Sequence, residues 1–445
     1  MKMLFTFLFA FASFFSFPAY SAMYMDTLFR IQGSNTIGES LAPSLAVQYL
    51  KTLGAENVRI QTLRAKNEKV IKGDLIKQGK SVQILISAHG SSTGFKGLID
   101  DTADIWASSR VVKYKELITV QEFVDLSESA SEHVLAIDGL AIVVNPKNPV
   151  SVLSKDQLAK IYAGDITNWS EVGGENKAIT LFARDHNSGT WDSFKNMVFS
   201  KTQRLSSSAS RYESSSILVN NVLRDSGAIG FIGMAFVGKS KLLAISDGSA
   251  QAQKPSLLSV ATEDYALSRR LYFYTLGNNY NHYVHDFLML SQSTKGQEAV
   301  SNEGFMSQNI LLIDDIMGRQ TEENLPVEYL DLTKDAKRLS VNFRFKPGSS
   351  KLDNKALKDI ERLLAFMKTQ PADKKILLLG FAEKRKNEDR SELLSKLRAM
   401  AVRRELSREG VYPKLTKGYG EFNPVASFEG RLSRIKNSRV EVWLQ

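Results

Sequence analysis

The alternation of strand-like and helix-like segments constrains this chain more than any other feature of its sequence. From about residue 27, short apolar runs typical of buried strands alternate with segments whose apolar residues have helical spacing. The expected elements, in chain order, are residues 28–32 (strand), 37–53 (helix), 58–63 and 82–87 (strands), 91–99 (helix), 103–108 and 134–145 (strands), 154–163 (helix) and 179–183 (strand). Such alternation predicts an α/β fold with a mainly parallel sheet, which binds ligands beyond the carboxyl ends of its strands.

The pattern changes after about residue 315. Residues 319–326 are mostly polar and predict a linker, and a compact β-α-β-α-β order follows. Its expected elements are residues 340–345, 354–367, 375–381, 389–409 and 439–444. Because 445 residues exceed one ordinary domain, we expect a first domain at residues 23–325 and a smaller α+β domain at residues 326–445.

Residues 1–22 have the composition of a secretory signal peptide. Lys2 supplies a positive charge, and the apolar run at residues 4–17 is too short to span a bilayer. Ala19 and Ser21 then provide the small residues that precede a cleavage site, although a retained anchor helix is the alternative. Because no other apolar stretch is long enough to cross a membrane, we expect an exported mature chain without a transmembrane segment.

Composition excludes several kinds of site. The chain has no cysteine, which rules out disulfides, thiolate metal sites and a cysteine nucleophile. Its net charge of +10 favours an anionic partner, but does not choose among nucleic acid, anionic lipid, a cell-wall polymer and a small anion.

Three loops share one composition, in which a strand is followed by a turn of Gly, Ser, Thr or Asn and then by a helix. They are residues 33–36, 90–94 and 187–190. Helix N-termini present free N–H groups and the positive end of a dipole, and Arg184, just before the third loop, can offer two parallel donors. Each loop alone could be a simple helix cap. Three loops and an arginine together predict a site for a tetrahedral oxyanion.

The sequence around these loops resembles the phosphate-binding proteins of periplasmic uptake systems. The resemblance covers residues 27–315 and is strongest in residues 138–146, 164–174 and 227–231, and in the Arg-x-x-x-Ser-Gly-Thr motif at residues 184–190. It implies a two-lobed periplasmic-binding-protein fold that closes on one phosphate, with a phosphate ABC transporter as a further partner. The phosphate ligands that it implies are Thr36, Ile37, Ser92, Arg184, Ser188, Gly189 and Thr190.

The chain departs from that family at residue 109. High-affinity members carry an aspartate there, whose carboxylate accepts the proton of hydrogen phosphate and repels sulfate; this chain has Ser109, followed by Arg110. A hydroxyl can either donate or accept a hydrogen bond. We therefore include Ser109 among the phosphate ligands and expect weaker rejection of sulfate.

Residues 340–445 resemble the OmpA-like peptidoglycan-binding domain. The motif Leu-Ser-x-x-Arg-Ala-x-x-Val at residues 394–402 carries the resemblance, together with residues 341–345 and 437–442. That family binds diaminopimelate, whose zwitterionic end requires a carboxylate for the ammonium and an arginine for the carboxylate. The resemblance implies Arg398 for the second role and Glu383, where the family has aspartate, for the first. Taken alone, Arg398 would be interpreted as a solvated charge on a helix, but the surrounding motif favours the binding role.

We find no sequence motif for catalysis. The chain has no phosphate-binding Gly-x-x-x-x-Gly-Lys motif, no zinc-type histidine motif and no Gly-x-Ser-x-Gly nucleophile motif, and its five histidines are scattered. The basic region around residue 385 could suit nucleic acid, but export and the lack of interleaved aromatic residues argue against it. We therefore expect neither an enzyme nor a cofactor or metal.

The sequence predicts a phosphate-binding protein that is tethered to peptidoglycan in the periplasm or envelope of a Gram-negative bacterium. An envelope structural or adhesive protein with a vestigial phosphate lobe is the alternative. An exported phosphatase is a more distant one.

Overall fold

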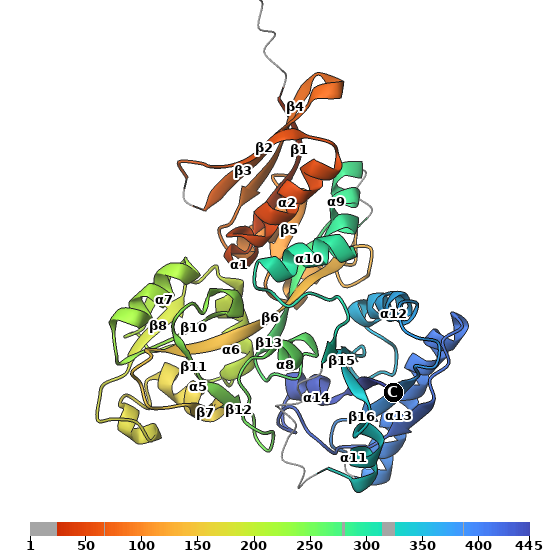
Figure 1. Ribbon diagram of the computed structural model, residues 1–445. Helices are drawn as coiled ribbons and strands as arrows, with labels where there is room; N and C mark the ends of the chain where they lie inside the picture. The colour runs from red at the N-terminus through yellow and green to blue at the C-terminus, as the bar shows by residue number, and fades with distance from the viewer. Residues whose placement is uncertain (1–24, 66, 278–280, 314–324, 386) are drawn as a thin grey trace, which may run out of the picture.

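The computed structural model describes residues 25–445 except residues 66, 278–280, 314–324 and 386. The predicted signal peptide, residues 1–22, and most of the predicted linker therefore lie outside the described residues. Two lobes and a C-terminal domain surround a central pair of strands (Figure 1). In the described part of the chain, none of the helices has the length and apolar character needed to cross a membrane.

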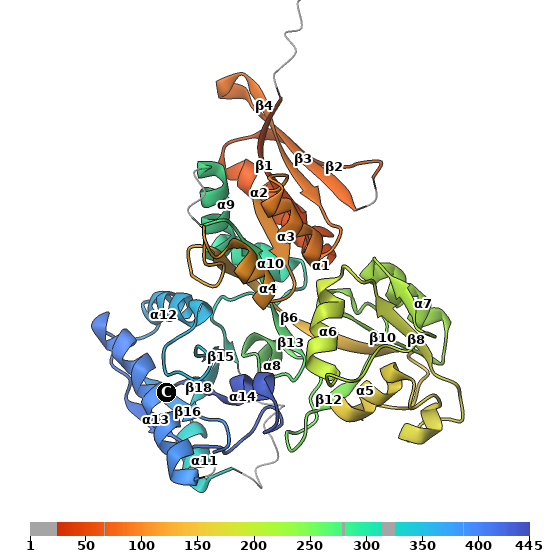
Figure 2. The ribbon, with the colours of Figure 1, turned by 180° about the vertical axis from the view of Figure 1, so that it is seen from behind.

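Lobe 1 is built on a sheet whose central strand is β1 (Met25–Gly33), parallel to β4 (Lys80–Ser87) and β5 (Ile105–Ser108). The antiparallel strands β3 (Glu68–Leu75) and β2 (Glu56–Thr62) extend it. One face is covered by α2 (Leu41–Thr52), α9 (His282–Gln292) and α10 (Thr294–Asn302), and the other by α3 (Ser91–Ile99) and α4 (Tyr114–Val120) (Figures 1 and 2).

The helix expected at residues 37–53 is interrupted. The four-residue helix α1 (Asn35–Gly38) ends before Ser40, which precedes α2. This break separates the loop at residues 33–36 from the long helix, so that α1 has its own N-terminus at the strand end.

Two strands cross between the lobes. The first half of β6 (Glu132–Val144) pairs with β13 (Ser268–Tyr274), which also pairs with β5, and the second half pairs with β10 (Ala228–Gly233). One sheet therefore passes through both lobes. A buried ion pair between Asp138 and Arg269, 2.6 Å, links the two crossing strands.

Lobe 2 continues this sheet from β10 to β8 (Thr180–Arg184) and β9 (Ser210–Tyr212). Its helices α5 (Lys155–Ala163) and α6 (Gly189–Val198) meet in an aromatic cluster, in which Phe194 stacks on Phe231 with a ring-centroid distance of 4.1 Å. The 3-10 helix η1 (Ile76–Gln78) connects β3 and β4 in lobe 1. The remaining elements between β6 and the C-terminal domain are α7 (Ser215–Arg224), α8 (Leu257–Ala261), β7 (Val152–Ser154), β11 (Lys241–Leu242), β12 (Ala244–Ser246) and the 3-10 helices η2 (Trp169–Val172) and η3 (Met234–Phe236).

The C-terminal domain has the expected β-α-β-α-β order. It contains β15 (Lys337–Phe343), α12 (Asn354–Met367), β16 (Ile376–Phe381), α13 (Glu388–Arg408) and β18 (Arg439–Leu444), with α11 (Val327–Thr333), β17 (Leu415–Gly418) and α14 (Arg431–Asn437) added. The strand order is β14-β15-β18-β16-β17. Its first strand, β14 (Leu312–Ile313), precedes the linker, so a segment before the expected boundary completes this sheet.

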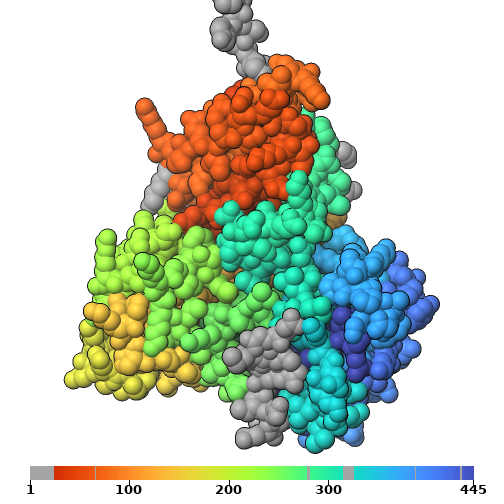
Figure 3. All heavy atoms as spheres, viewed as in Figure 1, coloured from red at the N-terminus to blue at the C-terminus, as the bar shows by residue number. Residues whose placement is uncertain are grey.

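The C-terminal domain packs against the rest of the molecule (Figure 3). Arg344 of this domain forms an ion pair with Asp264 at 2.8 Å, and Asp353 forms one with Arg270 of β13 at 2.8 Å. The contact is therefore made directly at the segment that crosses between the lobes.

Candidate functional site

Three helix N-termini meet where the lobes face each other. The N-cap Ser34 precedes α1, Gly90 precedes α3, and the N-cap Ser188 precedes α6 and accepts hydrogen bonds from the backbone N–H groups of Thr190 and Trp191. These are the three loops that the sequence singled out.

Hydroxyl groups link these loops, both within lobe 1 and across the cleft. Thr36 and Thr190 share a hydrogen bond of 3.1 Å between α1 and α6. The Ser109 Oγ atom lies 2.8 Å from the Ser34 Oγ atom and 3.4 Å from the Ser91 Oγ atom. The linked side chains are almost completely buried, so the cleft is closed in this structure.

Two glycines permit this close approach. A Cβ atom at Gly189 would lie 2.2 Å from the Ser91 Oγ atom and 2.6 Å from the Ser109 Oγ atom. A Cβ atom at Gly90, whose φ is +104°, would lie 2.2 Å from the Asn187 carbonyl oxygen. Larger residues at either position would therefore hold the lobes apart.

Arg184 ends β8 and is fully buried. Its guanidinium donates hydrogen bonds to the Tyr212 and Glu213 carbonyl oxygens and to the Ser215 hydroxyl, so no carboxylate among the described residues is bonded to it. Burial lowers the pKa of Arg184 to about 10. A buried cation without a bonded counter-charge is suited to an anionic ligand.

Arg110 is engaged elsewhere. Its guanidinium forms a two-pronged ion pair with Glu116, at 2.7 and 2.8 Å, and a further one with Asp192 of α6 at 3.0 Å. Lys113 also contacts Asp192, at 2.5 Å. These cations hold lobe 1 against lobe 2 and are neutralised by protein carboxylates.

Residues at the rim of the cleft also connect the two lobes. Glu213 of lobe 2 accepts a hydrogen bond of 2.5 Å from Asn67 and lies 3.7 Å from His89, both of lobe 1. Glu39 of lobe 1 accepts one of 2.9 Å from Ser216. The closed arrangement therefore includes contacts outside the hydroxyl cluster.

The structure brings most of the predicted phosphate ligands together. Thr36, Ile37, Ser109, Ser188, Gly189 and Thr190 gather at the convergence of α1, α3 and α6. Two predicted ligands are not part of this cluster. Ser92 is partly exposed while its neighbour Ser91 contacts Ser109, and the Arg184 guanidinium donates its hydrogen bonds to Tyr212, Glu213 and Ser215 instead. Sequence reasoning missed Ser34 and Ser91, although both lie in the loops that it identified.

A second site lies in the C-terminal domain. Glu383 follows β16, Arg398 lies on the buried face of α13, and the two side chains form an ion pair of 2.8 Å. The Ser438 hydroxyl donates a hydrogen bond to the same carboxylate, and the Arg398 guanidinium lies over the Phe345 ring at 5.4 Å. The two residues that were predicted to bind diaminopimelate are therefore adjacent.

The Glu383 carboxylate is strongly held in its ionised form. Burial alone would raise its pKa, but the hydrogen bonds from Ser438 and Arg398 outweigh that effect and lower the pKa to about 2. Arg385 adds an ion pair of 2.5 Å to the other carboxylate oxygen.

The described residues contain no group of three His, Asp or Glu side chains that could hold a metal ion. His282 and His285 lie on α9.

Comparisons with known proteins agree with this division of the chain. Residues 67–294 match the family model of the PBP superfamily domain, and residues 344–438 match that of the OmpA family. The chain belongs to the PBP superfamily, and its C-terminal domain belongs to the OmpA family.

The similar curated proteins include phosphate-binding proteins named PstS. That of Borreliella burgdorferi is 26% identical over 236 residues, which cover 52% of this chain and 81% of that protein. That of Bacillus subtilis is 32% identical over 204 residues, which cover 45% of this chain and 63% of that protein. The first domain is therefore PstS-like, and its relatives are binding proteins rather than enzymes.

Solved structures of similar proteins cover the same part of the chain. One is an ABC-type phosphate transport receptor from Vibrio cholerae, with 26% identity and a TM-score of 0.48 over 62% of this chain and 99% of that chain. Another is a putative phosphate ABC transporter substrate-binding protein with bound phosphate from Clostridium perfringens, with 24% identity and a TM-score of 0.49 over 64% of this chain and 99% of that chain.

Proposed function

We propose that this protein binds one inorganic phosphate ion between its two lobes and holds itself to peptidoglycan through its C-terminal domain. The observation that carries the first part is the buried cluster of hydroxyls at three converging helix N-termini, together with the fully buried Arg184, whose hydrogen bonds include no carboxylate. The proposed ligands are Thr36, Ile37, Ser92, Ser109, Arg184, Ser188, Gly189 and Thr190, to which Ser34 and Ser91 are added.

The hydrogen bonds of the closed cleft indicate how an anion would bind. The hydroxyls of Ser34 and Ser109 now bond to each other within lobe 1, and those of Thr36 and Thr190 bond across the cleft. An oxyanion that entered between the open lobes would take over these donors, and the lobes would close on it. Charge-assisted hydrogen bonds are stronger than the neutral ones they replace, so the exchange favours binding.

Isothermal titration calorimetry of the mature chain tests this proposal. We expect one phosphate per chain, with arsenate as a substitute and sulfate as a measurable competitor because Ser109 lacks a carboxylate. Absence of heat with both phosphate and arsenate would contradict the proposal.

The second part concerns the cell wall. Glu383 and Arg398 form a pair of opposite charges, and a zwitterion such as the free end of diaminopimelate can bind by exchanging partners with both. We place the mature protein in the periplasm or envelope of a Gram-negative bacterium, with a phosphate ABC transporter as a further partner.

Sedimentation with purified sacculi tests the wall contact. Wild-type protein should sediment, and free diaminopimelate should release it. Glu383→Asp, which shortens the carboxylate by one methylene and restores the residue usual in the family, should sediment at least as well. Wild-type protein that stays in the supernatant would refute the tether and leave the phosphate proposal intact.

A further inference from the structure

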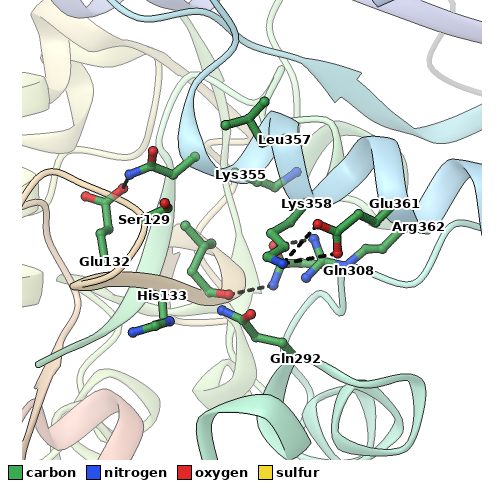
Figure 4. Close-up of a pocket in the computed structure, with 12 residues that line it drawn as sticks. Ser129, Glu132, His133, Gln292, Gln308, Lys355, Leu357, Lys358, Glu361 and Arg362 are labelled. Carbon is green, nitrogen blue, oxygen red and sulfur yellow. Dashed lines mark hydrogen bonds and ion pairs between the residues drawn. The ribbon is translucent and has the colours of Figure 1, made fainter. Parts of the chain in front are cut away.

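The C-terminal domain contacts lobe 1 beside the crossing strands. Asn354, in the first turn of α12, donates hydrogen bonds to the Ser127 carbonyl oxygen at 2.8 Å and to the Glu132 carboxylate at 3.1 Å. Arg362 of the same helix reaches Gln308 at 3.2 Å, where both residues line a small cavity between α12 and β6 (Figure 4). These contacts attach α12 to the lobe 1 end of β6.

The same domain also contacts the lobe 2 end of the crossing strands. Lys436 of α14 donates hydrogen bonds to the Tyr265 carbonyl oxygen at 2.8 Å and to the Ser268 hydroxyl at 2.5 Å. Tyr265 in turn donates to the Leu140 carbonyl oxygen of β6, where β6 enters lobe 2. Ser433, also of α14, contacts Asp247 of lobe 2 at 3.4 Å.

Anion exchange requires the lobes to move relative to each other. The hydroxyls of the cleft and Arg184 are buried, so an ion held there cannot leave while the lobes are closed. Rotation of lobe 1 against lobe 2 would change the distance between the attachments of α12 and α14, which belong to one domain with a shared sheet.

We propose that the C-terminal domain is a brace that opposes opening of the phosphate cleft and that peptidoglycan binding loosens it. The inference rests on the proposed function and concerns its regulation. It predicts that release of phosphate depends on residues far from the phosphate, at the interface between the domains.

Helix α14 connects this brace to the wall site. Lys436 anchors it to the crossing segment, and Ser438, two residues further on, donates to the Glu383 carboxylate. Arg344 donates to the Lys436 carbonyl oxygen and to the Thr262 carbonyl oxygen, and the adjacent Phe345 lies under Arg398. A ligand ammonium that binds Glu383 competes with Ser438 for this carboxylate. It would therefore weaken the hydrogen bond that holds the end of α14 in place.

Stopped-flow measurement of phosphate release from the full mature chain tests the brace. Lys436→Met keeps the length of the side chain and removes its donors, and it should speed release by roughly tenfold because a set of charge-assisted hydrogen bonds is lost. Asn354→Ala, which removes an attachment on the lobe 1 side, should also speed release. Lys414→Met is the matched control, since this exposed lysine contacts only Gln445 of its own domain in the described structure.

A peptide that ends in diaminopimelate tests the coupling. At saturation it should speed phosphate release from the wild type about fivefold, within the usual range of coupling between two sites, and add little in Lys436→Met. By reciprocity, phosphate should weaken binding of the peptide by the same factor by which the peptide lowers the affinity for phosphate at equilibrium.

The possible failures can be told apart. Wild-type protein that binds no phosphate would refute the proposed function and the brace together. Normal phosphate binding with unchanged release in both Lys436→Met and Asn354→Ala would refute the brace alone. Faster release in the variants with no effect of a peptide that is shown to bind would refute the link through α14.

Discussion

The phosphate cleft and the wall site both contain a buried arginine, but the two arginines have opposite surroundings. Arg184 is bonded only to carbonyl oxygens and a hydroxyl among the described residues, whereas Arg398 is paired directly with Glu383. The cleft therefore lacks a negative charge that its ligand would supply. At the wall site the buried pair is internally neutral, with the exposed Arg385 as a further cation, so a ligand with both charges can replace the pair without leaving one buried charge unpaired.

The strongest test of this contrast removes one member of the neutral pair. Arg398→Ala should lower the free energy of unfolding of the C-terminal domain by at most about 3–5 kcal/mol, the cost of breaking a buried pair, because the Glu383 carboxylate keeps only Ser438 and the exposed Arg385 as partners. Replacing both residues by Met and Leu should recover most of that loss. Denaturant unfolding measures both, and equal losses in the single and double variants would contradict the pairing.

The corresponding substitution in the cleft should lower the affinity for the anion rather than the stability of the fold. Arg184→Ala should weaken phosphate binding by about 1.5–3 kcal/mol, the usual worth of a hydrogen bond to a charged group. Calorimetry with phosphate measures the change. Arg204→Ala is the control, because Arg204 is bonded to carbonyl oxygens of its own loop in the same lobe. Equal affinity in Arg184→Ala and the wild type would exclude Arg184 as a ligand.

Low pH should lower the stability of the C-terminal domain through Glu383. The pKa of Glu383 in the folded protein, about 2, lies below its usual 4.5, so its stabilising contribution is complete above pH 4.5 and is lost as the pH falls toward 2. Thermal unfolding of the C-terminal domain at pH 5, 4 and 3 should show this decline, which Glu383→Gln should flatten. An identical decline in that variant would assign the effect to another group.

The smallest expected effect concerns the choice of anion. Ser109→Asp places a carboxylate beside the Ser34 and Ser91 hydroxyls, where it can accept a proton from hydrogen phosphate but repels sulfate. Sulfate should then compete about tenfold less well relative to phosphate, or about 1.4 kcal/mol. Competition calorimetry measures this ratio, and an unchanged ratio would show that residue 109 does not face the anion.

The sequence predicted the fold and the positions of the three strand-to-helix loops because both depend on local patterns. Helix α3 occupies the expected residues 91–99, and Ser188 caps α6 as its composition suggests. Strand β3 was missed because it has few apolar residues in a row, and β2, which pairs with it, is largely exposed. A helix cap and a ligand have the same sequence signature, so Ser34 and Ser91 could not be separated from ordinary caps.

Contacts between distant segments have no comparable pattern in the sequence. Lys436, Arg344 and Asp264 are charged residues of the kind that usually face solvent, and only the packing of the two domains joins them. The direct contact of Glu383 with Arg398 also depends on how α13 lies on the sheet. The resemblance to a family supplied both residues, but not their mutual ion pair.

Strand β14 has a practical consequence for the choice of a fragment boundary. It is contributed from before the linker, yet it covers the outer side of β15. A fragment that starts at residue 326 would expose unpaired backbone amide and carbonyl groups along β15, and such an open edge recruits strands from other molecules and promotes aggregation. A fragment that starts before residue 309 would keep its own covering strand. The boundary for expressing the C-terminal domain as an independent protein therefore lies upstream of the linker, although the change in sequence pattern lies at the linker.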